Sequence, residues 1–220
     1  MKRLFAIGDI HGCLDPLKEL IEKHIQLTKV DRLILLGDYI DRGSQSKQVV
    51  DYIIELQKNN YDIIPLMGNH EALLLDSINN EYLQNKWLNN GGNKTLMSFK
   101  VESAKDIPLQ YINFFNSLPY FYHFKNFIFV HAGFNDSHKT PFHDKYSMLW
   151  KSQKAYSNHL LSNKIIIHGH RPISIERCKK QIENNNQVIN IDTGCVYSHN
   201  INHGKLTSIE LIPNTRLYFV

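Results

Sequence analysis

The chain has 220 residues, a formal net charge of +4 and 42% hydrophobic residues, so it shows no sign of disorder and can bury a full core. Its Lys and Arg residues are scattered, so a nucleic-acid partner is not indicated. The three cysteines are too few and too dispersed for a disulfide framework or a Cys-rich zinc site. The length predicts a single domain over residues 1–220.

The location of the protein is expected to be cytoplasmic. The N-terminal segment reaches Gly8 before a signal-peptide core could form. The longest apolar runs fall far short of the roughly 20 residues that a membrane helix needs. We therefore expect no membrane partner, and we expect the protein to be a monomer.

The first part of the chain alternates short apolar runs with polar loops that contain glycine. Three such runs occupy residues 4–7, 32–36 and 63–67. The spacing predicts one helix opened by Asp15 as N-cap with Pro16 after it, and a second capped by Ser44 or Ser46 and ending near Lys58. This order predicts βαβ units, in which the loops after parallel strands lie side by side.

The pattern of apolar and polar residues in the later part of the chain predicts a helical insert and further strands. Residues 76–126 are expected to form a mainly helical insert, with one helix near residues 108–115. Apolar runs at residues 120–124 and 127–130 flank Lys125 and Asn126, a spacing typical of a tight β-hairpin. Three further strands are expected at residues 165–167, 187–192 and 205–211.

Side chains that can bind a metal follow several of these strands. They are Asp9, His11, Asp38, Asn69, His131 and His170. Oxygen and imidazole ligands without thiolate favour Mn²⁺, Fe or Zn over Ca²⁺, and six ligands exceed one tetrahedral zinc site. A carboxylate that bridges two ions would resolve the excess, and Asp38 is central in the chain and in the sheet. We therefore predict two divalent metal ions, with Mn²⁺ first and Fe or Zn as alternatives.

A two-metal site of this kind predicts a phosphoester hydrolase. Two ions about 3.5 to 4 Å apart can hold a hydroxide between them and clamp a phosphate for in-line attack. Arg42 can bind two phosphate oxygens with its planar guanidinium. His70 can protonate the leaving oxygen if a carboxylate orients its ring, and Asp41 is the candidate for that partner.

Three ordered motifs resemble those of bacterial metallophosphatases of the phosphoprotein phosphatase (PPP) type, in the calcineurin-like superfamily. They are GDIHG at residues 8–12, GDYIDRG at residues 37–43 and GNHE at residues 68–71, at intervals of about thirty residues. HAG at residues 131–133 and HGH at residues 168–170 resemble the later histidine motifs. The resemblance implies an α/β fold of the calcineurin-like αββα sandwich type.

The resemblance also implies a role for each site residue. The first metal would be held by Asp9, His11 and Asp38, and the second by Asp38, Asn69, His131 and His170. His70 would be the catalytic acid and Asp41 its partner, while Arg42 and Asn69 would contact the substrate.

One position departs from the family pattern. Bacterial relatives usually carry a second phosphate-binding arginine two residues after a tryptophan, but here Trp150 is followed by Ser152 at that position. Lys151, Lys154 or Arg171 could supply the positive charge instead, although a lysine lacks the planar fork of arginine.

The function implied by the resemblance is a serine/threonine protein phosphatase, with phosphotyrosine as a further substrate and a phosphorylated protein or peptide as partner. One alternative is a symmetrical dinucleoside tetraphosphate hydrolase. Such hydrolases usually have Gln where His11 stands and lack the Asp of Asp41, so both residues favour the phosphatase. The other alternative is a phosphate-binding module with weak turnover, which only Ser152 supports.

Overall fold

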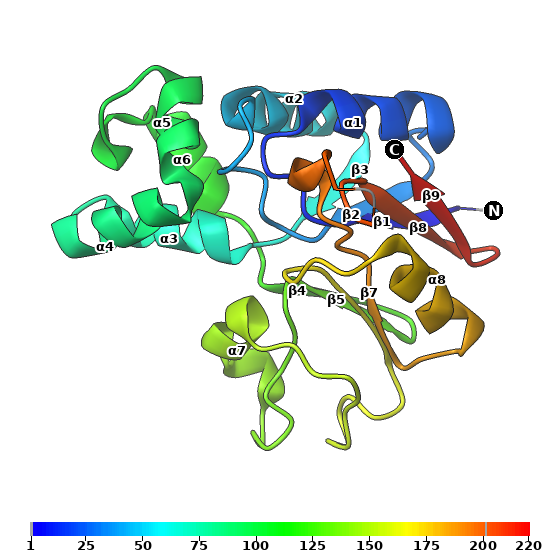
Figure 1. Cartoon of the computed structure of the whole chain (residues 1–220). Helices are drawn as coiled ribbons and strands as arrows, with labels where there is room; N and C mark the ends of the chain where they lie inside the picture. Colours follow the sequence, from blue (N-terminus) through cyan, green and yellow to red (C-terminus); the bar gives the residue numbers. More distant parts are fainter. Residues whose placement is uncertain (1, 201) are drawn as a thin grey trace.

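The computed structural model of the chain describes residues 2–200 and 202–220, and it contains two facing β-sheets with helices outside them (Figure 1). Within these residues, the first sheet has the strand order β3-β2-β1-β8-β9 and the second has the order β4-β5-β6-β7. The first sheet consists of β1 (Leu4–Ile7), β2 (Arg32–Leu35), β3 (Asp62–Pro65), β8 (Thr207–Ile212) and β9 (Arg216–Phe219). The second consists of β4 (Phe121–Phe124), β5 (Phe127–Val130), β6 (Ile165–His168) and β7 (Val188–Asn190).

Strand β1 shows why the chain forms stacked layers. Phe5 and Ile7 pack into the core under the helices that cover the first sheet, whereas Leu4 and Ala6 pack into the core between the two sheets. Because successive side chains of a strand point to opposite faces, a strand that is apolar throughout must be covered on both sides. A third core lies on the outer face of the second sheet. These layers form the αββα sandwich that the family resemblance implies.

The helices that cover the first sheet differ from the sequence predictions at their caps. They are α1 (Leu14–Glu19), the π-helical turn η1 (Leu20–His24) and α2 (Ser46–Lys58). The prediction of Asp15 as N-cap was wrong, because Cys13 holds that position and Asp15 lies in the first turn of α1. The prediction of a serine cap for α2 was also wrong, because Gln45 precedes the helix. The hydroxyl of Ser46 instead accepts a hydrogen bond from the backbone N–H of Asp41 at 3.1 Å.

A group of helices lies between β3 and β4 in the sequence, and Figure 1 shows them at one side of the sandwich. They are α3 (Asn69–Ser77), α4 (Glu81–Trp87), the π-helical turn η2 (Leu88–Gly92), α5 (Asn93–Phe99), the short turn η3 (Ala104–Asp106) and α6 (Leu109–Asn116). Trp87 and Phe115 are fully buried in the core that these helices share with α2. Among the described residues, none of the helices is long and apolar enough to span a membrane.

The second sheet confirms the predicted hairpin, because β4 pairs antiparallel with β5 across Lys125 and Asn126. Strands β5, β6 and β7 then run parallel to one another. The remaining helical segments are η4 (Pro141–His143), α7 (Lys145–Trp150), α8 (Ile175–Glu183) and η5 (Cys195–Tyr197). Neither α8 nor β9 is predicted from the sequence.

Candidate active site

The predicted site residues follow the carboxyl ends of parallel strands in both sheets. Asp9 and His11 follow β1, residues 38–42 follow β2, Asn69 and His70 begin α3 after β3, His131 follows β5 and His170 follows β6. Because the carboxyl ends of neighbouring parallel strands meet at one edge of a sheet, loops far apart in the sequence can meet there. The structure brings all of these side chains to one region between the two sheets.

Several of these residues have a left-handed backbone. The φ angles are +46° at His11, +53° at Asp38, +70° at Asp41, +67° at Arg42 and +74° at His170. Residues other than glycine adopt this conformation at a cost on the order of 1 to 3 kcal/mol, and in this chain five of the ten described residues that do so belong to the site. The tight turns are therefore maintained for the direction in which they point these side chains, rather than for local stability.

One group of donor atoms gathers around His131. Its Nδ1 donates to the backbone oxygen of Leu36 at 2.9 Å, so its Nε2 carries a lone pair. This Nε2 lies 2.7 Å from Oδ1 of Asn69, 3.2 Å from Nδ1 of His170 and 3.5 Å from a carboxylate oxygen of Asp38. The lone pair of this Nε2 and those of the Asn69 and Asp38 oxygens repel one another, and a cation placed among them would relieve the repulsion.

A second group of donor atoms gathers around His11. Its Nδ1 donates to the backbone oxygen of Ile40 at 2.9 Å, which leaves a lone pair on Nε2. This Nε2 lies 3.5 Å from a carboxylate oxygen of Asp38 and accepts from Nη1 of Arg42 at 2.8 Å. The group is completed by His70, so Asp38 belongs to both groups.

The charges of these side chains suit the binding of cations. Burial lowers the pKa of His11 and of His170 to about 3, and it also lowers the pKa of His131, so the three imidazoles are neutral. Burial alone would raise the pKa of Asp38, but the neighbouring histidines outweigh that effect and lower it. Neutral imidazoles beside an ionised carboxylate are the protonation states that metal binding requires, so the donor set fits divalent cations.

Asp9 lies at the edge of this site and belongs to neither donor group. Both of its carboxylate oxygens accept from the backbone N–H of His170 at 3.1 Å. Burial, then the nearby charges of Asp192 and Asp38, raise the pKa of Asp9 well above its usual value. A Cβ at Gly169 would lie 2.0 Å from the carboxylate of Asp9, so only glycine fits at this position.

His70 and Asp41 form a buried pair. Nδ1 of His70 donates to Oδ2 of Asp41 at 2.7 Å. Burial lowers the pKa of His70, but the charges of Asp38 and Asp41 outweigh that effect and raise it. The carboxylate of Asp41 is also held by Nε1 of Trp87 at 2.9 Å and by the hydroxyl of Thr95 at 2.6 Å. The sequence analysis assigns no role to Trp87 or Thr95, and no local pattern marks their contact with Asp41.

Glu71 is a further residue whose role the sequence analysis misses. Its side chain is fully buried and accepts from the backbone N–H groups of Asp38 at 2.9 Å, Tyr39 at 2.8 Å and Gly68 at 3.1 Å. Burial and the charge of Asp38 raise the pKa of Glu71 to about 8. Its position in the GNHE motif was the only available signal. Glu71 fixes the loop after β2 to the start of α3, and so fixes the position of Asp38.

Ser152 stands where bacterial relatives usually carry the second phosphate-binding arginine. The hydroxyl oxygen of Ser152 is buried and has no hydrogen-bond partner among the described residues. Ser152, Lys154 and Arg171 line the same cavity, which is described below. Of the three candidate replacement cations, Lys154 and Arg171 therefore lie on the same side of the site as Ser152, whereas Lys151 does not line this cavity and stands over the ring of Tyr146.

Comparisons with known proteins agree with this arrangement. A bis(5'-nucleosyl)-tetraphosphatase of asymmetrical type from Oceanobacillus iheyensis is 25% identical and covers 96% of this chain and 91% of that enzyme. A symmetrical bis(5'-nucleosyl)-tetraphosphatase from Pseudomonas syringae is 40% identical, but over only 33% of this chain and 23% of that enzyme.

A solved protein serine/threonine phosphatase from Saccharomyces cerevisiae has the same fold, with a TM-score of 0.72, 15% identity, and coverage of 99% of this chain and 79% of that one. Residues 2–202 match the family model for calcineurin-like phosphoesterases. Because this match spans nearly the whole chain and the sandwich fold agrees with it, the chain belongs to the calcineurin-like phosphoesterase family.

Proposed function

We propose that the protein hydrolyses bis(5'-nucleosyl) tetraphosphates at a centre of two divalent cations. The observation that carries the proposal is the similarity to the asymmetrical tetraphosphatase from Oceanobacillus iheyensis, which extends over 96% of this chain and 91% of that enzyme. The proposed substrate is a nucleotide, which is the alternative from the sequence, and not the phosphoprotein that the motifs favour. The residues that favour a phosphoprotein, His11 and Asp41, are single positions, whereas the similarity is spread over the whole domain.

Calcineurin-like phosphoesterases use a dinuclear centre of divalent metals, and this chain carries candidate ligands for it. We propose that Asp9, His11 and Asp38 hold one cation, and that Asp38, Asn69, His131 and His170 hold the other. Mn²⁺ is the first choice, with Fe or Zn as alternatives, because the donors are oxygens and imidazoles. When bound, two such ions activate water as a nucleophile and neutralise charge on the phosphate.

Arg42 is proposed to bind the phosphate under attack. Its Nη1 now donates to the Nε2 of His11, the atom proposed to hold a metal. The lone pair of Nε2 cannot serve both groups, and the guanidinium and a metal ion repel each other. With His11 engaged as a ligand, the guanidinium of Arg42 would be free to bind two phosphate oxygens with its planar fork.

His70 is proposed to deliver a proton to the leaving oxygen. The bond from its Nδ1 to Asp41 fixes the ring, so a second proton, when the ring is charged, would lie on Nε2, which is 3.9 Å from a carboxylate oxygen of Asp38. Because the charges of Asp38 and Asp41 raise the pKa of His70, its ring retains the second proton to a higher pH than a free imidazole does.

The test is a direct comparison of substrates. The protein loaded with Mn²⁺ is incubated with diadenosine tetraphosphate and, separately, with a phosphoserine peptide, and kcat/KM is measured for each. We expect the nucleotide to have the higher value. Chromatography of the products then shows the position of cleavage. Asymmetrical cleavage yields ATP and AMP, whereas symmetrical cleavage yields two ADP molecules. A higher kcat/KM for the phosphopeptide would overturn the proposal.

A serine/threonine protein phosphatase is the second candidate. Its support is His11 and the pair formed by Asp41 and His70, whose hydrogen bond is 2.7 Å long. A phosphate-binding module without turnover is the third, supported by Ser152 alone. Release of nitrophenolate from p-nitrophenyl phosphate in the presence of Mn²⁺, Fe²⁺ or Zn²⁺ would exclude it.

A further inference from the structure

A cavity of about 540 Å³ lies beside the candidate active site, on the side of the second sheet. Its wall includes residues 152–154, which follow α7, the loop after β6, the first turn of α8, and strand β7. Three cationic side chains line it, namely Lys154, Arg171 and Arg177. None of the lining residues in the described part of the chain is Asp or Glu.

The three cations have no counter-charge of their own. Among the described residues, the ion pairs include neither Lys154, Arg171 nor Arg177, and their side chains donate no hydrogen bond within the protein. Most other wall residues with polar side chains are already engaged: Gln153 donates to the backbone oxygen of Phe134, and Gln181 bonds to the backbone of Asn190. The cavity therefore offers positive charge, with few other groups free to bind a ligand.

The backbone that carries these cations is fixed. Nδ2 of Asn190 donates to the backbone oxygen of Arg171 at 2.8 Å, which fastens the loop after β6 to β7. The hydroxyl of Ser174 accepts from the backbone N–H of Arg177 at 3.2 Å, which fixes the first turn of α8. The backbone at Arg171 and Arg177 is thus held in place, and their exposed guanidinium groups are free to bind phosphate oxygens with their planar forks.

Two residues that line the cavity are close neighbours in the sequence of a proposed metal ligand, His170. Arg171 directly follows His170, and His168, which lines the cavity, precedes it by two residues.

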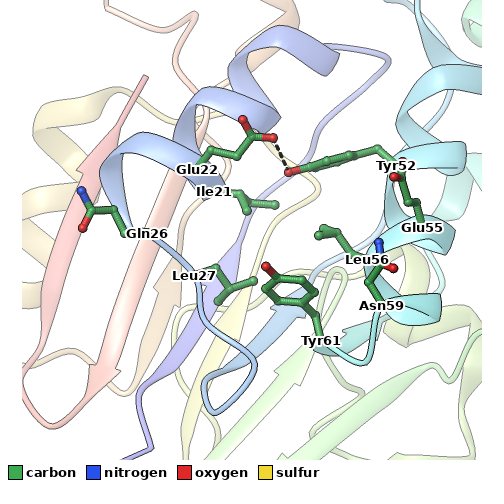
Figure 2. A pocket seen from close by; sticks show the side chains of 9 residues that line it. All are labelled: Ile21, Glu22, Gln26, Leu27, Tyr52, Glu55, Leu56, Asn59 and Tyr61. Carbon is green, nitrogen blue, oxygen red and sulfur yellow. Dashed lines mark hydrogen bonds between the residues drawn. The ribbon is translucent and has the colours of Figure 1, made fainter.

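A second cavity of similar size has the opposite character. It has a volume of about 580 Å³, lies between η1 and the end of α2, and is lined by Glu22, Glu55 and two tyrosines (Figure 2). Neither Lys nor Arg is among its described lining residues. Its position at the far ends of the helices places it away from the loops of the site, and its carboxylates would repel an anion.

We propose that the cavity lined by Lys154, Arg171 and Arg177 binds the phosphate chain of the leaving nucleotide. The identity of that ligand rests on the proposed hydrolysis of bis(5'-nucleosyl) tetraphosphates. A leaving nucleotide carries two or three phosphates, whereas the leaving group of a simple phosphomonoester carries none. The cavity therefore selects polyphosphate substrates over monoesters.

The first test measures binding without any metal or turnover. Isothermal titration calorimetry of the metal-free protein with inorganic tripolyphosphate is carried out for the wild type, Arg171→Gln and Arg177→Gln. We expect each substitution to weaken binding at least fivefold. Lys179→Gln is the matched control, since Lys179 lies on the same helix but stands over the ring of Phe219, outside the cavity. Equal binding by the wild type and Arg177→Gln would overturn the proposal.

The second test measures selectivity in the enzyme loaded with Mn²⁺. We expect Arg177→Gln to reduce the ratio of kcat/KM for diadenosine tetraphosphate to that for p-nitrophenyl phosphate at least tenfold, while Lys179→Gln leaves the ratio within twofold. An unchanged ratio in Arg177→Gln would overturn the cavity proposal alone. If the wild type hydrolyses p-nitrophenyl phosphate but not the tetraphosphate, and tripolyphosphate binding still depends on Arg177, the proposed function fails while the anion site stands.

Discussion

Arg42 occupies a position that couples the phosphate site to the metal site. Its Nη1 lies 2.8 Å from the Nε2 of His11, and its backbone N–H donates to the oxygen of Gly91 at 3.3 Å. A Cβ at Gly91 would come within 2.9 Å of the Arg42 side chain, so the two turns fit closely. The guanidinium is therefore held near the metal ligands before any substrate arrives.

Replacement of Arg42 by Ala is expected to lower kcat/KM for diadenosine tetraphosphate by more than tenfold, or about 1.4 kcal/mol. The reason is the loss of the only arginine side chain that hydrogen-bonds a proposed metal ligand among the described residues. Steady-state kinetics on the variant loaded with Mn²⁺ provides the measurement, and Arg216→Ala, on the distant edge strand β9, is the control. A loss smaller than tenfold would mean that another cation, such as Arg171, has taken over.

At the scale of residues, the sequence predicts the side chains that carry the chemistry better than those that support them. Asp38 and His131 stand in short motifs that contain glycine, and the fixed order of these motifs along the chain makes them recognisable as a set. Glu71 and Trp87 act through contacts with loops more than thirty positions away in the chain, and nothing near either residue marks that contact. The departure at Ser152 could be read from the sequence, but the cavity beside it could not.

At the scale of elements, the helical segment between β3 and β4 in the sequence supports the proposed acid. Trp87 ends α4 and Thr95 lies on α5, and both donate to the carboxylate of Asp41. Asp41 in turn holds His70. Helices outside the two sheets thus determine the orientation of a ring at the centre of the site.

Trp87→Phe is expected to lower kcat about tenfold and to change KM less than twofold, because it removes one hydrogen bond from Asp41 while it keeps an aromatic ring in the core. The matched control is Tyr111→Phe on α6, which removes a hydroxyl that donates to Asp51 at 2.7 Å, away from Asp41. Kinetics and metal content are measured for both variants. Equal losses of kcat in the two variants would assign Trp87 a general role in stability only.

The elements that the sequence analysis misses have weak local signals. Helix α8 buries few apolar side chains, with Cys178 fully buried and Ile182 partly so, because it packs at the edge of the sandwich. Strand β9 lies at the edge of the first sheet, and its residues are exposed or partly exposed. Its apolar run at residues 217–220 follows the predicted strand at residues 205–211 closely, and the run alone does not show that it pairs as a separate strand. The predicted Ser46 cap of α2 fails for another reason. The Ser46 hydroxyl accepts a hydrogen bond from the backbone N–H of Asp41 in the site instead of capping the helix.

At the scale of the whole molecule, the two sheets meet through the donor groups of the site. Asp38 follows β2 in the first sheet, while His131 and His170 follow β5 and β6 in the second. A cation held by these three side chains would link the two sheets, in addition to the apolar core between them.

Addition of Mn²⁺ to the metal-free protein is therefore expected to raise its Tm. At a concentration about 100 times the Kd, the gain is about 2.7 kcal/mol, or about 5 to 10 °C for a chain of this size. Differential scanning calorimetry with and without Mn²⁺ measures the shift, and His131→Ala should abolish most of it. A Tm that does not respond to Mn²⁺, Fe²⁺ or Zn²⁺ would contradict the proposed ligands.

The stability of the whole molecule in acid is expected to depend on Asp31. This carboxylate is 2% exposed and accepts from the guanidinium of Arg3 at 2.6 Å and from Thr28. Burial alone would raise the pKa of Asp31, but these hydrogen bonds lower it to about 2. Since the unfolded carboxyl has a pKa of about 3.9, the stabilisation is complete above about pH 4 and is lost as the pH falls towards 2.

Asp31→Asn should therefore reduce the free energy of unfolding at pH 7 by about 1 to 3 kcal/mol, with the difference from the wild type closing towards pH 2. Urea unfolding across this pH range measures it, and Glu102→Gln, at an exposed position, is the control. A difference that stays constant from pH 7 to pH 2 would show that the carboxylate charge is not responsible.

The left-handed backbone at His11, Asp38, Asp41, Arg42 and His170 has a consequence for how the protein would respond to selection. Glycine adopts this conformation with little cost, so it relieves strain at such positions. A library of variants selected only for resistance to heat should therefore enrich glycine at positions such as 42. A library selected for growth that requires hydrolysis should retain arginine there. The two selections would diverge first in these turns.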